Sequence, residues 1–382
     1  MATAHTPLAV LDLVPVTTGS NAGQALRNSL DLVRRAEQLG YSRYWFAEHH
    51  FNPGVAGTSP AVLLALAATA TSAIRLGSGA LQLGHRTALS AVEEFGLLDA
   101  VHPGRFDLGL GRSGGSAERG APPERGGPGT VAVVEGLTPN GLRIPARYSN
   151  AHLQSSPRAA LYQGLLQQSG AQSQAYDDQV ADILALLAGD YAPDAGFETH
   201  VVPGEGAELQ LWILGSSAGV SARTAGANGL RFAANYHVSP GTVLEAVEGY
   251  REAFKPSAEL DRPYVSVSAD VVVADDEGAA RELAAGYGLW VRSIRSGEGA
   301  IAYPSPQEAR RHIWSEEDRA LVADRTETQF VGTAPQVAER LRTLRDATGA
   351  DELIVTTITH DHADRVRSFE LLAAEWGLRA AA

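Results

Sequence analysis

Short runs of β-branched and aromatic residues recur through the first third of the chain, and each run stops abruptly at polar or glycine residues. The clearest of these runs is RYWFAEHH at 43–50, and comparable runs occupy 8–16, 74–84 and 105–115. Segments with a helical spacing of apolar residues separate them. The order therefore predicts repeated β/α units with Glu48, His49 and His50 at the carboxyl end of a strand. In a (β/α)8 barrel, that face carries the active site.

The same periodicity continues along the chain and predicts eight strands joined by helices. Strands are expected at 8–14, 42–47, 74–79, 105–110, 209–214, 230–234, 264–273 and 352–358. Helices are expected at 21–39, 60–72, 88–101, 218–228, 240–254, 276–290, 335–348 and 362–377. Asn21 is placed to cap the first helix and Gly40 to end it. Eight alternating units favour an α/β fold of the closed (β/α)8 TIM-barrel type.

Two stretches interrupt this order, and we expect both to be insertions on the C-terminal face of a single domain spanning residues 1–382. The first insertion covers about 113–175, and its Gly/Pro-rich part at 113–130 is expected to form a flexible loop that acts as a lid. The second covers about 298–334, directly before the last β/α unit. Loops at this face commonly carry function.

Composition excludes several classes of protein. The net charge of −13 argues against a nucleic-acid partner, which needs a basic surface. The chain has no cysteine, so it forms no disulfide or thiolate nucleophile, and its single lysine, Lys255, belongs to no phosphate-binding loop motif. The longest apolar stretch, at 61–70, is too short to span a membrane, and the N-terminus does not resemble a signal peptide. We therefore expect a cytoplasmic enzyme without a membrane partner.

Two neighbouring histidines follow the second expected strand. Because successive side chains of a strand point to opposite faces, one of His49 and His50 is expected to face the barrel mouth and the other the barrel wall. Glu48 and Arg112 are expected to converge on the same end of the barrel, which raises the weight of a functional role against a structural one. Adjacent histidines are a poor spacing for metal ligands, so no metal is expected here.

Two further motifs leave alternatives open. His360 and His362 form a His-x-His pair that suits a metal, but the aspartates beside them fit helix capping equally well. The string at 109–114 matches Gly-x-Gly-x-x-Gly, the fingerprint of a dinucleotide site. A Gly/Pro tract follows it instead of a helix, which favours a turn that aims Arg112 into the barrel mouth.

A cluster of small and hydroxyl residues, Gly215, Ser216, Ser217 and Ser221, joins the strand at 209–214 to the next helix. Free backbone N–H groups at a helix start, together with serine hydroxyls, form an anion site that suits a phosphate. Ordinary N-capping is the alternative, but capping needs only one serine. The cluster therefore favours a phosphate site.

Taken together, these segments resemble the bacterial luciferase-like monooxygenase family. The matching strings, which cover most of the chain outside the insertions, are LDLVPV, RYWFAEHH, IRLGSGALQL, HPGRFDLGLGR, ILGSSAGVSA, VGTAPQVAERL and LIVTTITHDHADR. The resemblance implies a (β/α)8 barrel that binds reduced flavin mononucleotide (FMN), or in some branches the deazaflavin F420. Members typically receive flavin reduced by a separate reductase and then react it with O2. The sequence looks most similar to a flavin-dependent subgroup found in bacterial natural-product tailoring, such as antibiotic biosynthesis.

The resemblance also implies roles for individual residues. His49 matches the catalytic histidine beside the flavin, and Arg112 matches the arginine near the flavin phosphate. The matching cofactor-binding residues are Glu48, the Gly79-Ala80 pair joined by a non-proline cis peptide, Gly215, Ser216, Ser217 and Ser221. The chain departs from close relatives at Leu83-Gly84-His85-Arg86, where they tend to read leucine-proline-asparagine-histidine. Contacts to substrate or flavin at that segment are in doubt.

The expected function is therefore that of a monooxygenase that takes reduced FMN from a separate reductase and uses O2 to oxygenate a small organic substrate. No segment offers a separate dinucleotide site, which agrees with a two-component scheme. A homodimer is expected. An F420-dependent oxidoreductase and a non-catalytic flavin-binding protein are the alternatives.

Overall fold

Eight parallel strands form a closed barrel at the centre of the computed structural model, which describes residues 6–112, 135–192 and 197–379. The strands are β1 (Leu8–Asp12), β2 (Arg43–Phe46), β3 (Arg75–Ser78), β5 (Phe106–Gly111), β8 (Gln210–Gly215), β9 (Arg231–Asn235), β10 (Val265–Val273) and β12 (Glu352–Thr356). Neighbours in the sheet follow chain order, and β12 pairs with both β10 and β1, which closes the sheet. The predicted (β/α)8 TIM barrel is confirmed.

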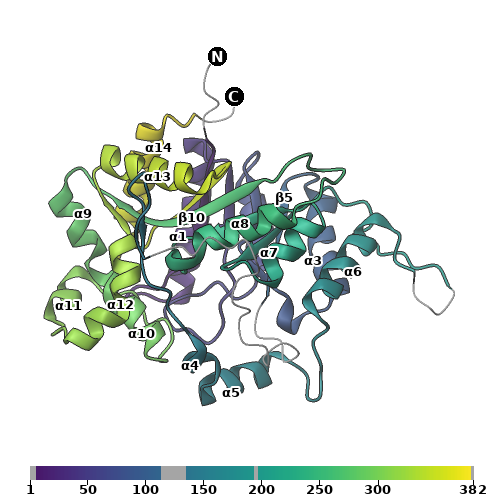
Figure 1. Ribbon diagram of the computed structural model, residues 1–382, viewed down its shortest axis with the longest axis horizontal. Helices are drawn as coiled ribbons and strands as arrows, with labels where there is room; N and C mark the ends of the chain where they lie inside the picture. Colours follow the sequence, from purple (N-terminus) through teal and green to yellow (C-terminus); the bar gives the residue numbers. More distant parts are fainter. Residues whose placement is uncertain (1–5, 113–134, 193–196, 380–382) are drawn as a thin grey trace.

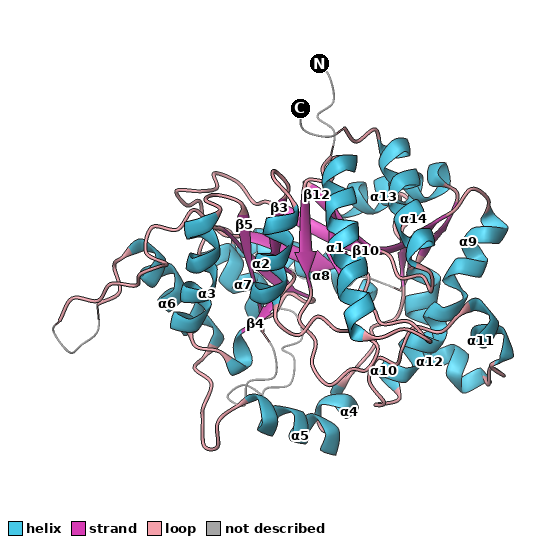
Figure 2. Cartoon of the chain, turned by 180° about the vertical axis from the view of Figure 1, so that it is seen from behind, coloured by secondary structure: helices cyan, strands magenta, loops and turns pink. Residues whose placement is uncertain are grey.

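Helices surround the strands, as Figure 2 shows. The surrounding helices are α1 (Ala22–Leu39), α2 (Pro60–Ala70), α3 (Ala88–Val101), α6 (Tyr176–Ala188), α7 (Val220–Ala227), α8 (Val243–Ala253), α13 (Ala334–Thr348) and α14 (His362–Trp376). The predicted ends of the first helix are confirmed. The Asn21 side chain accepts a hydrogen bond from the backbone of Gln24, and Gly40 ends the helix with a left-handed φ of 86°.

Two helices differ from the prediction. The single helix expected at 276–290 was wrong: α9 (Glu277–Leu283) ends in a 3₁₀ turn at Ala284–Gly286, and α10 (Tyr287–Arg295) follows it. At this turn the chain packs closely, since a Cβ at Gly286 would lie 2.7 Å from the Pro304 carbonyl oxygen. Helix α6 was not predicted because the Gln- and Ser-rich stretch before it was read as part of an insertion.

The first insertion continues past the undescribed residues with a short hairpin and two helices. Its elements are β6 (Gly136–Leu137), β7 (Arg143–Ile144), α4 (Ala151–Gln154) and α5 (Pro157–Leu166). In both views α4 and α5 lie below the barrel, on the side away from the two termini (Figures 1 and 2). Arg158 on α5 donates to the backbone oxygen of Phe51, 2.5 Å away, so this insertion contacts the loop that follows β2. The predicted lid at 113–130 lies outside the described residues.

The second insertion contains regular elements that the prediction lacked. They are α11 (Pro306–Arg311), α12 (Glu316–Thr328) and the short strand β11 (Phe330–Gly332), which pairs with β10 outside the closed ring. Near the end of β3, the chain forms β4 (Leu81–Gln82) and a 3₁₀ turn at Leu83–His85 before α3 begins. A further 3₁₀ turn at Pro240–Thr242 precedes α8.

Side chains alternate between the barrel interior and the helix layer, and this alternation positions the site. Trp45 and Trp212 fill the interior with their ring centroids 5.0 Å apart. At the amino-terminal end of the strands, Arg43 donates to Asp107 at 2.6 Å and to Glu352 at 2.8 Å. The indole N–H of Trp45 also donates to Asp107, at 2.9 Å. A network of paired charges therefore closes this end of the barrel.

Candidate active site

His49 continues the inward-facing positions of β2 two residues beyond Ala47, so its ring faces the barrel mouth. Its backbone N–H donates to the Gly57 carbonyl at 2.7 Å, which fixes the chain at this point. The Nδ1 atom is buried and has no hydrogen-bond partner among the described residues. Burial lowers the pKa of His49 to about 4 and outweighs the opposing effect of the Glu48 carboxylate. The imidazole is therefore neutral at pH 7 and offers one donor and one acceptor.

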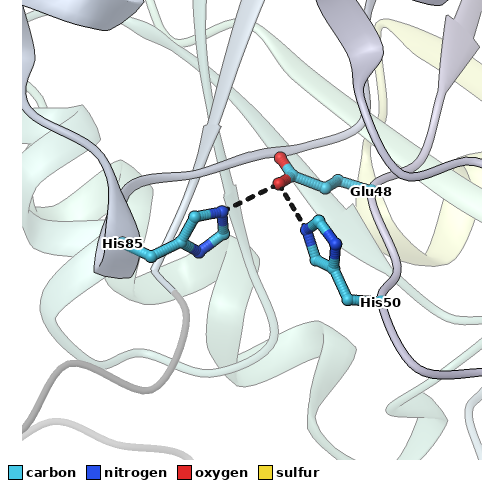
Figure 3. A group of neighbouring side chains, drawn as sticks. All are labelled: Glu48, His50 and His85. Atoms are coloured by element: carbon cyan, nitrogen blue, oxygen red, sulfur yellow. Dashed lines mark hydrogen bonds and ion pairs between the residues drawn. The ribbon is translucent and has the colours of Figure 1, made fainter. Parts of the chain in front are cut away.

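Glu48 and His50 occupy the alternate positions and point to the other side, as the strand geometry predicts. One Glu48 oxygen, Oε1, accepts from His50 at 2.8 Å, from His85 at 3.1 Å and from Arg86 at 2.7 Å (Figure 3). The second oxygen accepts from the backbone N–H of Gln82 at 2.9 Å. Burial alone would raise the pKa of Glu48, but the His85 hydrogen bond and the Arg86 charge hold that pKa at about 2. Hydrogen bonds of Glu48 therefore connect the end of β2 to the segment after β3.

The donor atoms of Glu48, His50 and His85 lie within 4.8 Å of one another, a grouping close enough to hold a metal ion. However, Arg86 already places a guanidinium among them, with Nη1 2.9 Å from Nε2 of His85. A bound cation would have to displace this charge, so the geometry favours an ion-paired network over a metal centre. The sequence interpretation missed this cluster, although its signal was present in the departure at Leu83-Gly84-His85-Arg86.

The Gly79-Ala80 peptide bond is cis, as predicted. The surroundings of these residues leave no room for larger side chains. A Cβ at Gly79 would lie 2.8 Å from a Leu11 methyl group, and a Cβ at Gly111 would lie 2.8 Å from Cβ of Ala80. Small residues therefore line one wall of the barrel mouth between β3 and β5.

The predicted phosphate residues follow the carboxyl ends of two paired strands, β5 and β8. Gly111 pairs with Leu214, so continuing this parallel register by one residue sets Arg112 beside Gly215. A Cβ at Gly215 would lie 2.9 Å from the Phe232 ring and 3.1 Å from Cβ of Ser221, so only glycine lets α7 approach so closely. Arg112 is exposed to solvent at this end of the barrel.

Helix α7 begins at Val220 with Gly219 at its N-cap position, and no side chain caps it. The capping alternative for Ser216 and Ser217 therefore does not hold. The backbone N–H groups of the first turn, the neighbouring hydroxyls and Arg112 form a donor set that fits a phosphate.

The alternative metal pair does not converge. His360 Nε2 lies 3.0 Å from the Thr18 carbonyl oxygen, whereas His362 Nε2 lies 2.9 Å from Asp31 on α1. His360 lines a cavity of about 850 Å³ beside the barrel, whose acidic lining includes Asp275 and Glu282. Arg311 and Arg367 also line this cavity, but no predicted flavin residue contributes to it.

His237 was missed because no motif surrounds it in the sequence. It continues the inward positions of β9, two residues after Asn235, and its Nδ1 atom lies 2.6 Å from the hydroxyl of Ser268 on β10. Counting alternate residues from the buried Ala233 would have placed it at the mouth.

Comparison with known proteins agrees with this geometry. The family model described as luciferase-like monooxygenase matches residues 6–130 and 180–352. The chain belongs to the luciferase-like monooxygenase family. The protein YvbT of Bacillus subtilis (strain 168) is 36% identical over 374 residues, which cover 97% of each chain. A luciferase-like monooxygenase of Escherichia coli (strain K12) is 33% identical over 362 residues, covering 95% of this chain and 94% of its own. This luciferase-like monooxygenase is therefore an oxidoreductase.

Solved structures of the family share the fold. Apo-MsnO8 superposes with a TM-score of 0.77 at 29% identity over 98% of each chain. The oxygenating constituent of 3,6-diketocamphane monooxygenase from Pseudomonas putida, in complex with FMN, has a TM-score of 0.62 at 19% identity over 97% of each chain. An F420-dependent secondary alcohol dehydrogenase has a TM-score of 0.60 at 13% identity and covers 97% of this chain and 99% of its own. The last two show the fold alone. Among the described residues, no helix of this luciferase-like monooxygenase is long and apolar enough to cross a membrane.

Proposed function

We propose that the protein is a two-component monooxygenase that binds reduced FMN at the barrel mouth and uses O2 to oxygenate a small organic substrate, such as a secondary-metabolite intermediate. One observation carries this proposal: Arg112 and the segment 215–217 that leads to α7 follow two paired strands, at the same end of the barrel as the neutral ring of His49, whose Nδ1 atom has no partner among the described residues. An anion site and a free imidazole at one mouth suit a phosphorylated redox cofactor.

The residues present fit such a cofactor. Arg112 and the backbone N–H groups at the start of α7 would hold the phosphate, with Ser216 and Ser217 adding hydroxyl donors. Gly79, Ala80 and Gly111 form a wall without bulky side chains, against which a flat ring can lie. When bound, the reduced flavin supplies the electrons that activate O2.

His49 would act at the reacting edge. Its neutral ring can donate one hydrogen bond and accept another without bringing a further charge into the mouth. Glu48 would act through the chain, because its carboxylate binds His85, Arg86 and the backbone of Gln82 and so fixes the strand end that carries His49. We assign Glu48 a positioning role and His49 the catalytic role.

The cofactor is the first point to test. Reduced FMN and reduced F420 would each be titrated anaerobically into the protein, and O2 uptake would be followed with a panel of aromatic and aldehyde compounds. We expect saturable binding of reduced FMN, weaker binding of F420, and O2 uptake that rises with a substrate. Tighter F420 binding with hydride transfer would support the dehydrogenase alternative. FMN binding without any O2 reaction would support a non-catalytic flavoprotein.

We also propose that a separate reductase supplies the flavin; this is supported by the described residues, which form one barrel without a second βαβ nucleotide-binding unit. Without a reductase, the protein should not reduce FMN with NADH. Adding a free flavin reductase should then start O2 uptake. Reduction of FMN by the protein and NADH alone would contradict the two-component scheme.

We also propose that two copies associate through α2 and α3. Helix α2 is apolar on all sides, a pattern typical of helices buried on all sides. Yet Val62 and Leu66 on α2 and Leu97 and Val101 on α3 remain exposed in the single chain. Leu66→Glu should convert the dimer to a monomer in light-scattering chromatography, whereas Leu161→Glu on α5, also exposed, should not. A monomeric wild-type protein would contradict this proposal.

A further inference from the structure

Strand β9 and the residues after it present two polar side chains to the barrel mouth, and both retain hydrogen-bonding capacity that no described residue uses. Asn235 ends the strand, and its Oδ1 atom is buried without a partner among the described residues. His237 follows at the next inward position, and no described residue bonds to its Nε2 atom. An unpaired buried polar atom is costly, so Oδ1 of Asn235 points to a ligand that satisfies it.

Ser268 fixes the ring of His237. The Ser268 hydroxyl lies 2.6 Å from Nδ1 of His237 and 3.4 Å from the Ala234 carbonyl oxygen, to which it donates. We infer the tautomer with the proton on Nδ1, in which the hydroxyl accepts from Nδ1–H of His237 and Nε2 is left as an acceptor.

His237 faces His49 across the barrel. In the ring of eight strands, β2 and β9 are separated by four steps in either direction, so they stand opposite each other. The inward alternation continues past the end of β2 to Ala47 and His49, and past Asn235 of β9 to His237, so both rings lie at the barrel mouth. Burial, with smaller effects from Arg325 and His49, lowers the pKa of His237 to about 3, so this ring is also neutral at pH 7.

We propose that Nε2 of His237 and Oδ1 of Asn235 form the substrate subsite, and that they select substrates carrying a hydroxyl or N–H donor near the oxidised position. The proposal rests on the proposed function, since His49 then acts from the opposite side of the same ligand. Two neighbouring acceptors on one strand suit a phenol, an enol or an amide N–H, and they leave an ether or a plain aromatic ring unbound.

The probes are phenol, which carries one donor, and anisole, which has the same ring with the donor methylated. Protein labelled with ¹⁵N-histidine would be titrated with each probe, with and without reduced FMN, under anaerobic conditions. We expect phenol to shift the Nε2 resonance of His237 and to bind about tenfold more tightly than anisole. Equal binding of the two probes, or no response at His237, would overturn the proposal.

Three variants separate this role from a structural one. His237→Phe keeps the ring shape but removes the acceptor, so the preference for phenol should vanish. His237→Gln places an oxygen near the position of Nε2 and should retain the preference. Ser268→Ala should leave the ring in place but free the tautomer, which the ¹⁵N shifts report directly. A preference for phenol that persists in His237→Phe would contradict the assignment.

The same samples keep the two proposals distinct. If reduced FMN fails to bind while phenol still selects His237, the proposed cofactor is wrong and the subsite stands. If reduced FMN binds normally to wild type and to His237→Phe while the two probes bind alike, the subsite is wrong and the proposed function stands.

Discussion

The two ends of the barrel interior use polar side chains in opposite ways. At the amino-terminal end, Arg43 binds both Asp107 and Glu352, and the second oxygen of Asp107 accepts from Arg75 at 2.8 Å. At the carboxyl-terminal end, by contrast, His49 Nδ1 and Asn235 Oδ1 are buried without partners among the described residues. One end is a network of paired charges, and the other holds buried polar atoms that no described residue pairs.

This difference separates stability from function. A buried ion pair adds little net stability, but breaking it leaves an uncompensated charge that is costly to bury. Unpaired groups at the mouth also carry a cost, and a ligand removes it. The comparison therefore predicts that changes at the closed end alter folding and that changes at the mouth alter binding and turnover.

The largest expected effect is at His49. His49→Ala should lower product formation by about 10²–10⁴, because the hydrogen bond or proton transfer at the reacting edge is lost. Reduced-flavin affinity should stay near that of the wild type, and hydrogen peroxide should replace the product. Product and peroxide would be measured together with whichever compound of the panel the wild type oxidises. If the variant still converted reduced flavin to product without releasing peroxide, the catalytic role of His49 at the mouth would be contradicted.

Arg43 tests the closed end. Arg43→Met keeps an apolar stem of similar length but leaves Asp107 and Glu352 buried without their main cation, so the free energy of unfolding should fall by about 3–5 kcal/mol. Urea denaturation measures this loss, and flavin affinity measured below the transition should not change. Arg34→Ala, which removes an exposed pair on α1, is the matched control and should change stability by less than about 1 kcal/mol. A weaker affinity for flavin in an Arg43→Met protein of unchanged stability would contradict the separation of folding and binding between the two ends.

The smallest expected effect is a pH dependence. In the folded state the pKa of His49 is about 4, below its ordinary value of 6.5, so the unfolded chain binds the proton more readily between these values. Stability contributed by the neutral ring is therefore fully present above pH 6.5 and is lost as the pH falls toward 4. His49→Gln should flatten this slope by about 1.4 kcal/mol per pH unit in urea titrations between pH 4 and 6.5. Equal slopes in the two proteins would show that the ring is not held neutral.

The barrel was predictable from the sequence because its strands carry strong local signals. The eight runs of β-branched and aromatic residues are buried in the closed sheet, and local chemistry determined the ends of α1. The break at Gly286 was not predictable, because it depends on close packing against Pro304, 18 residues further along the chain. Long-range contacts of this kind produce no periodic pattern in the sequence.

The site was predictable only in part for a similar reason. His49 and the segment after β8 have local motifs, and strand register brings Arg112 beside Gly215. Because side chains alternate along the strand, Glu48 points to the side opposite His49. The sequence-based prediction that Glu48 binds the cofactor did not take this alternation into account. The partners of Glu48 and His237 lie more than 30 residues away, at His85 and Ser268, so only the folded chain brings them together.

The central claim is that the mouth, and Arg112 in it, forms the anion site for a reduced flavin. Anaerobic titration with reduced FMN tests it most directly when wild type, Arg112→Ala and the control Arg34→Ala are compared. A charge-assisted contact of roughly 1.5–3 kcal/mol predicts a ten- to hundredfold weaker affinity for Arg112→Ala and no change for Arg34→Ala. Wild-type affinity in Arg112→Ala, or an equal loss in both variants, would contradict the account.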